Sequence, residues 1–142
     1  MVDPVSHTLN IEAAPASFVH LRLHTEFSIV DGLLRMKPLI ARTRELNMPA
    51  IAVTDLANMF GLIKFYSGAM AAGIKPVCGC DVVVKGDEGR ADTRLLLLAK
   101  DREGYLNLSQ LISKIYTDST QRTDASLRFD QLATHTEGVI AL

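Results

Sequence analysis

Three groups of polar residues in this chain of 142 residues have the side-chain chemistry to hold a divalent metal ion. The first is His20-x-Arg22-x-His24, and the other two are single carboxylates, Asp55 and Asp81. Imidazole and carboxylate groups together suit zinc, iron or manganese. Each group is predicted to lie at the carboxyl end of a strand, and in parallel β/α folds that edge of the sheet carries the functional site.

Arg22 argues against a working metal centre. Residues two apart on an extended strand point to the same side, so the guanidinium of Arg22 is expected to share a face with His20 and His24. A fixed cation there would repel a metal ion by several kcal/mol at low dielectric. The residue types alone therefore favour an ion pair between Arg22 and Asp55 or Asp81 over a metal site.

Other catalytic and binding motifs find weaker support. Ser28, His24 and Asp31 are close in sequence, but no Gly-x-Ser-x-Gly nucleophile elbow surrounds Ser28. The sequence contains no glycine-rich phosphate loop of the Walker or Rossmann type. Cys78 and Cys80 are predicted to share one strand face, where two buried thiols are favoured over a pair of metal ligands.

The composition is typical of a globular domain. The net charge is −1, 22% of the residues are charged and 48% are hydrophobic. Because the basic residues are scattered, we predict no nucleic-acid-binding surface. No apolar run approaches the roughly 20 residues that span a bilayer, so no membrane partner is expected. Residues 1–17 lack the features of a secretory signal and are interpreted as a mobile leader of a cytoplasmic protein.

Hydrophobic periodicity predicts strands that alternate with helices. Strands are expected at 18–23, 50–54, 75–84, 94–99 and 139–142. Helices are expected from near Pro38, from about Met59 to just before Gly73, after a cap at Asp101, and around Phe129. This alternation indicates the α/β class with a mainly parallel sheet. Because the chain stops inside an apolar strand, we expect residues 18–142 to be an incomplete domain.

Three blocks of the sequence resemble the PHP domain (polymerase and histidinol phosphatase) at the N-terminus of bacterial DNA polymerase III alpha subunits. They are residues 18–32 (FVHLRLHTEFSIVDG), 48–84 (MPAIAVTDLANMFGLIKFYSGAMAAGIKPVCGCDVVV) and 104–116 (GYLNLSQLISKIY). The resemblance implies a distorted β/α barrel, of which residues 18–142 hold the N-terminal portion.

Members of this family with an intact site bind a small metal cluster used for phosphoester hydrolysis or proofreading. Their opening motif has the form His-x-His, where this chain has Arg22 and His24. Their second motif has a histidine after the aspartate, where Leu56 follows Asp55, and their third strand ends in glutamate, where this chain has Asp81. The resemblance therefore implies the proteobacterial form of the domain, in which the metal and its catalysis are lost.

The resemblance also implies a structural and partner-binding role in DNA replication, within a parent protein that is a DNA-directed DNA polymerase. The expected partners are the remainder of the alpha subunit and the separate proofreading exonuclease subunit. Self-association of the isolated chain is also expected, because the strand at 139–142 would leave an unpaired edge. Two alternatives stay open, an active metal-dependent phosphoesterase or exonuclease of the same family and a free-standing small binding protein.

Overall fold

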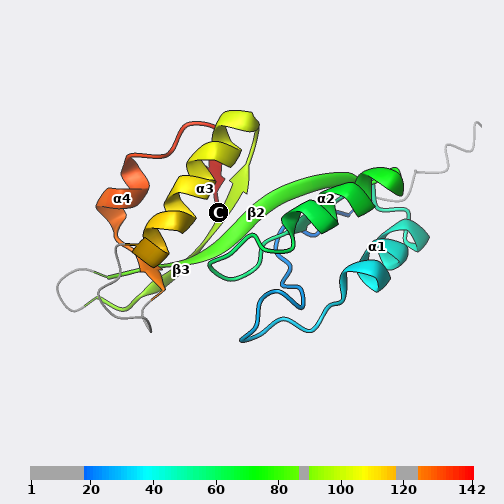
Figure 1. Cartoon of the computed structure of the whole chain (residues 1–142), viewed down its shortest axis with the longest axis horizontal. Helices are drawn as coiled ribbons and strands as arrows, with labels where there is room; N and C mark the ends of the chain where they lie inside the picture. Colours follow the sequence, from blue (N-terminus) through cyan, green and yellow to red (C-terminus); the bar gives the residue numbers. More distant parts are fainter. Residues whose placement is uncertain (1–17, 87–89, 118–124) are drawn as a thin grey trace, which may run out of the picture.

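A computed structural model of the chain describes residues 18–86, 90–117 and 125–142 (Figure 1). Its elements in chain order are α1 (Met36–Glu45), β1 (Ala50–Val53), α2 (Leu62–Ala71), β2 (Lys75–Val84), β3 (Thr93–Ala99), α3 (Arg102–Thr117), β4 (Ser126–Leu127), α4 (Phe129–Ala133) and β5 (Val139–Ala141). The predicted α/β class is confirmed. The expected leader at 1–17 lies outside the described residues. Among the helices that the structure describes, none is long and apolar enough to cross a membrane.

The sheet is mixed, so the predicted mainly parallel sheet is wrong. The strand order is β1-β2-β3-β5, with β4 also pairing with β2. β2 pairs in parallel with β1 and β4, whereas the β2–β3 and β3–β5 pairs are antiparallel. Only residues 85–92 connect β2 to β3. A parallel crossover needs about a dozen residues or more, so a connection this short returns the chain antiparallel.

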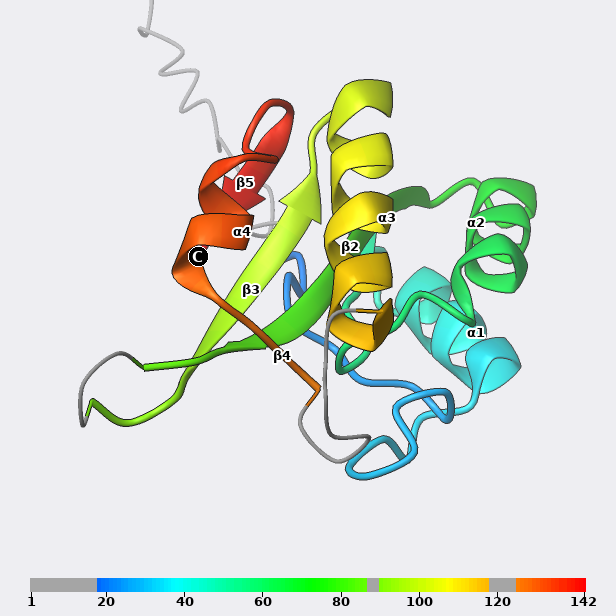
Figure 2. The same ribbon diagram turned by 60° about the vertical axis from the view of Figure 1, so that its left-hand side comes forward.

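The long strand β2 joins two halves of the molecule. Its first half pairs with β1 and its second half pairs with β3. α1 and α2 lie beside one end of β2, and α3 and α4 lie beside the other (Figures 1 and 2). The buried core around α3 contains Cys80, Val82, Leu97, Leu108, Leu111 and Ile115. The core around α2 contains Met36, Ile51, Val53, Leu62, Phe65 and Ile74.

The segment expected as the first strand is extended but forms no regular ladder. The amides of Ala52 and Thr54 donate to the carbonyls of His20 and Leu23, each at 2.9 Å. The donors, Ala52 in β1 and Thr54 just after it, are two residues apart, whereas their acceptors are three apart, so the extra residue breaks the pairing as a bulge does. Thr54 compensates, because its hydroxyl accepts a hydrogen bond from the Leu23 amide at 2.8 Å. The segment is therefore tethered along β1 without being a strand.

The helix boundaries follow the predicted local signals closely. The carboxylate of Asp101 accepts a hydrogen bond from the amide of Gly104 at 2.9 Å, which is the cap expected for α3. α2 ends before Gly73, whose φ of +74° suits a residue without a side chain. α2 begins at Leu62, three residues later than the start expected near Met59.

The first turn of α3 touches the backbone just before β5. A Cβ atom added to Gly104 would lie 1.8 Å from the carbonyl oxygen of Gly138. That same carbonyl accepts a hydrogen bond from the Lys100 amide at 2.8 Å. The contact therefore fixes how α3 meets the strand β5, and it leaves no room for a side chain.

We expect Gly104→Ala to destabilise the chain by about 1–3 kcal/mol, because the backbone of Gly138 must move to admit the methyl group. The measurement is the free energy of unfolding in urea. Gly68→Ala in α2 is the matched control, since there the nearest atom is the flexible end of Ile40 at 2.6 Å and alanine favours a helix. Equal losses in the two variants would contradict the close-contact argument.

Candidate functional site

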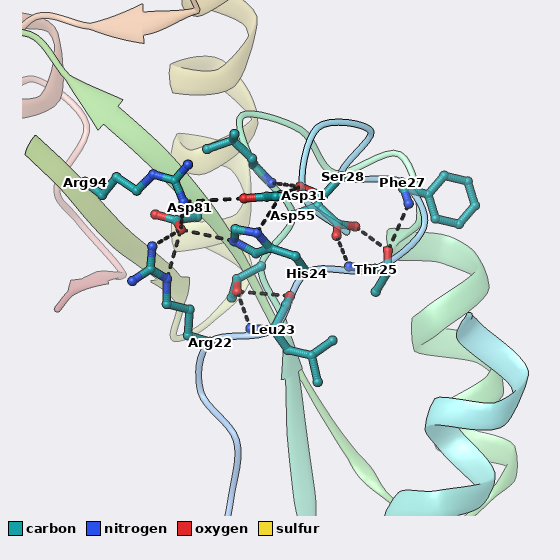
Figure 3. Close-up of polar contacts among 12 residues, drawn as sticks. Arg22, Leu23, His24, Thr25, Phe27, Ser28, Asp31, Asp55, Asp81 and Arg94 are labelled. Carbon is teal, nitrogen blue, oxygen red and sulfur yellow. Dashed lines mark hydrogen bonds and ion pairs between the residues drawn. The ribbon is translucent and has the colours of Figure 1, made fainter. Parts of the chain in front are cut away.

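The buried carboxylate of Asp81 gathers the charged residues of the site (Figure 3). Asp81 lies in β2, and its side chain is 1% exposed. The Nε and Nη2 atoms of Arg22 donate to its Oδ2 atom at 2.9 and 2.5 Å. His24 Nε2 lies 3.0 Å from the same oxygen. Of the three polar side chains of the tethered segment (His20, Arg22 and His24), Arg22 and His24 therefore contact one carboxylate in a strand that is distant in sequence.

Arg94 in β3 adds a second guanidinium, with Nη1 at 3.8 Å from Asp81 Oδ2. All of these contacts go to one oxygen, and Asp81 Oδ1 is buried without a hydrogen-bond partner among the described residues. Arg22 thus places two donors on a single oxygen instead of spanning both oxygens of the carboxylate as a fork. An unpartnered buried acceptor of this kind costs about 1–3 kcal/mol.

His24 links Asp81 to a second carboxylate, Asp31. His24 Nδ1 lies 2.9 Å from Asp31 Oδ1, and the Ser28 hydroxyl donates to the same oxygen at 2.7 Å. The hydrogen bond from Ser28, followed by the contact with His24, holds the pKa of Asp31 below its ordinary value. His24 is therefore held between two carboxylates, one at each ring nitrogen.

Ser28, His24 and Asp31 therefore do come together, but not as a nucleophile and its base. The Ser28 hydroxyl donates directly to Asp31 and accepts a hydrogen bond from the Leu56 amide at 3.1 Å. A nucleophilic serine needs a hydrogen bond to the base that removes its proton. Ser28 instead positions the loop that follows His24.

Asp55 has a different role from Asp81. Its side chain accepts hydrogen bonds from the Thr25 amide at 2.5 Å and from the Thr25 hydroxyl at 2.8 Å. Burial is the main cause that raises the pKa of Asp55 above its ordinary value. Asp55 and Asp81 are both predicted as ion-pair partners of Arg22. Within the described part of the chain, only Asp81 forms this ion pair.

Two other expected site positions contribute no polar side-chain contact to Asp81. The ring of His20 packs edge-on against Phe18, with centroids 4.7 Å apart. Leu56 forms an isolated backbone bridge to Asp81, but its own side chain is apolar. Sequence reasoning missed Arg94. The register that pairs Val83 with Arg94 puts this arginine on the same sheet face as Asp81, and recognising the β2–β3 hairpin would have revealed it.

The donor set does not fit a metal centre. Within residues 18–86, 90–117 and 125–142, no three or more His, Cys, Asp and Glu side chains gather in a way that could hold a metal ion. The guanidinium of Arg22 also occupies the position beside Asp81 Oδ2 that a cation would take. The two cysteines do not change this picture, because burial raises the pKa of the Cys80 thiol to about 12 and also raises the pKa of Cys78.

Comparison with known proteins finds relatives over most of the chain. Residues 20–142 match the family model of the PHP domain. A DNA polymerase III subunit alpha from Pseudomonas aeruginosa is 50% identical over 127 residues, which cover 89% of this chain and 11% of the relative. The subunit of the same name from Escherichia coli K12 is 43% identical over 126 residues, covering 88% of this chain and 11% of the relative. The chain thus spans about a ninth of the length of these relatives.

Solved structures show a related fold. A protein from Bifidobacterium adolescentis assigned as a metal-dependent phosphoesterase superposes with a TM-score of 0.58 at 17% identity, covering 77% of this chain and 36% of that one. An amidohydrolase from Chromobacterium violaceum gives a TM-score of 0.51 at 23% identity, covering 68% and 34%. At these identities the likeness concerns the fold alone.

Replacing Arg22 tests the ion pair. We expect Arg22→Met, which keeps an apolar stem, to lower the free energy of unfolding by about 1–3 kcal/mol because it leaves the Asp81 carboxylate with weaker partners. The loss is smaller than for a fully buried pair because the Arg22 side chain is 51% exposed and water screens it. Arg42→Met is the control, since Arg42 pairs only with the exposed Glu45 in the described contacts. Similar urea midpoints for the two variants would show that the Arg22–Asp81 pair contributes no more to stability than the exposed Arg42–Glu45 pair.

Replacing the two differently placed carboxylates gives opposite pH trends. With the pKa of Asp55 raised in the folded state, stability is lost as pH rises from the unfolded value through the folded one. We therefore expect Asp55→Asn to gain stability relative to the unmodified chain as pH rises above about 3.8. Asp31 is the control: its lowered pKa contributes stability that is present above the unfolded value and is lost as pH falls below it. Asp31→Asn should therefore lose stability relative to the unmodified chain as pH rises towards about 3.8 and show no further relative change above it. Parallel trends in urea unfolding would contradict both assignments.

Proposed function

The chain belongs to the PHP domain family, and we propose that it is the N-terminal PHP module of a replicative DNA polymerase III alpha subunit, with a structural and partner-binding role. Its proposed partners are the remainder of that subunit and the separate proofreading exonuclease subunit. Support comes from the DNA polymerase III alpha subunits that are 43–50% identical to it over nearly nine-tenths of its length. In this proposal, polymerase activity belongs to parts of the protein outside these 142 residues.

The observation that carries the structural role is the contact of Arg22 with Asp81. A buried carboxylate needs a compensating positive charge, and here the chain itself supplies it through Arg22 and Arg94, with His24 as a further hydrogen-bond partner. A bound metal would supply a Lewis acid and an activated water for phosphoester hydrolysis. A guanidinium offers only donors and a single diffuse charge, with no open coordination position.

The apolar side chain of Leu56 also supports a structural role. This position faces Asp81 through a backbone bridge, where a ligating side chain from the neighbouring strand could reach the carboxylate. Leucine has no lone pair for a metal or a proton. The site therefore retains the geometry of a strand-edge cluster while lacking the donors that hydrolysis would need.

We expect the purified chain to contain no stoichiometric zinc, iron or manganese and to show no chelator-sensitive hydrolysis of bis(p-nitrophenyl) phosphate. Elemental analysis by mass spectrometry and a colorimetric assay with each added metal provide the measurements. Stoichiometric metal together with hydrolysis that a chelator abolishes would instead establish the alternative function, an active phosphoesterase.

The matched control restores the missing ligands. The triple variant Arg22→His, Leu56→His and Asp81→Glu should bind zinc or manganese more tightly than the unmodified chain, measured by calorimetric titration. Arg22→Met serves as a second control, because it removes the cation without adding a ligand. If the triple variant binds metal no more tightly than Arg22→Met does, the absence of these three ligands does not explain a low metal affinity of the unmodified chain.

A further inference from the structure

α2 exposes an apolar stripe about 100° around the helix from its core contacts, because each exposed apolar residue directly follows a buried one. Leu62, Phe65 and Ala69 are buried, and Lys64 is the only charged residue of the helix. Ile63, Tyr66 and Met70 are 78%, 49% and 56% exposed. Their spacing of i, i+3 and i+7 places them along one line of the helix surface. A helix that is apolar on two sides is typical of an element covered by a further partner.

The stripe borders a groove between α2 and α3. The two helices lie on the same side of β2, because Cys78 packs with the α2 core and Cys80, two residues on, packs with the α3 core. The groove has a volume of about 530 Å³. Tyr66 and Ile63 form one wall, Tyr105 of α3 lies on the other, and Pro76 and Cys78 form the floor. None of the residues in the Arg22–Asp81 site lines it.

One end of the groove is positively charged. Lys100 and Arg102 line it there, and neither forms an ion pair with another residue in the described part of the chain. The single carboxylate of the lining, Asp101, is turned to the start of α3, where it caps the Gly104 amide. The groove therefore combines two tyrosines, an exposed isoleucine and two cations that outnumber the single carboxylate of the lining. Aromatic residues and arginine are enriched at the binding hot spots of protein interfaces.

We propose that this groove docks an acidic segment of a partner protein, with one or two apolar side chains held between Tyr66 and Tyr105 and its carboxylates beside Lys100 and Arg102. Two cations at one end of an apolar groove are too few to follow a nucleic-acid backbone. A second copy of the chain is disfavoured, because a two-fold contact through this face sets the same patch against itself. Both copies would then bring the same excess of positive charge into the contact.

Selection from a displayed library of short random peptides on the 142-residue chain tests this inference. The enriched peptides should carry Asp or Glu next to Leu, Ile, Phe or Trp. Synthetic fluorescent versions should bind more weakly as salt rises. Ile63→Ser and Arg102→Glu should each weaken binding about tenfold or more in fluorescence anisotropy. Ile29→Ser and Arg44→Glu make the same chemical changes at exposed positions elsewhere and should leave binding within about twofold.

Three results would overturn the inference. They are a selection that yields no acidic apolar peptides, peptides whose affinity is unchanged by Ile63→Ser and Arg102→Glu, and a chain that dimerises through this face. Sedimentation equilibrium detects the last case, because Ile63→Ser would then convert a dimer to a monomer. Circular dichroism of each variant separates loss of binding from loss of folding. Since Ile63 is 78% exposed, its substitution removes little buried surface.

Discussion

A carboxylate in the middle of a buried strand has to be compensated by nearby charge, and Asp81 imposes this requirement on the rest of the molecule. Its side chain is 1% exposed and is largely removed from bulk water. Arg22 and His24 reach it from the tethered N-terminal segment, and Arg94 reaches it from β3. One buried charge thus joins three parts of the chain that are distant in sequence. The N-terminal segment needs no regular ladder along β1 to reach Asp81, because Thr54 holds the amide of Leu23, the residue between Arg22 and His24.

The neighbouring carboxylate of Asp55 is buried like that of Asp81 but has different hydrogen-bond partners. Asp55 follows the end of β1, and Asp81 lies within the neighbouring strand β2, where its amide donates to the Asp55 carbonyl at 3.2 Å. Asp81 receives cationic donors, whereas Asp55 receives the neutral amide and hydroxyl of Thr25. Burial without a cationic partner raises the pKa of Asp55, as expected when desolvation outweighs the hydrogen bonds. Asp55 consequently fixes where the loop after His24 begins, and Asp81 fixes where the polar ends of Arg22 and His24 converge.

Local sequence signals predicted the elements that depend on neighbouring residues. The Asp101 cap of α3 and the end of α2 before Gly73 follow from capping and backbone conformation, which act over a few residues. Sequence also narrowed the partner of Arg22 to two carboxylates but could not choose between them. That choice depends on Thr25, which satisfies Asp55 and leaves Asp81 for the cation. The mixed sheet could have been predicted from the short 85–92 connection, whereas the irregular pairing of the first segment depends on a register set by packing in three dimensions.

A buried carboxylate whose charge is balanced by side chains affects the free energy of folding differently from one whose charge is balanced by a metal ion. Where a metal ion holds a site together, part of the folding free energy comes from metal binding and varies with metal supply and pH. In this chain the positive charges are covalently part of the fold, so the cluster around Asp81 assembles whenever the N-terminal segment reaches β2. The cost is side-chain entropy, since the half-exposed Arg22 must be held in one conformation. For a module whose proposed role is to hold other proteins, a carboxylate that is compensated by the chain's own side chains keeps this compensation when the supply of metal changes.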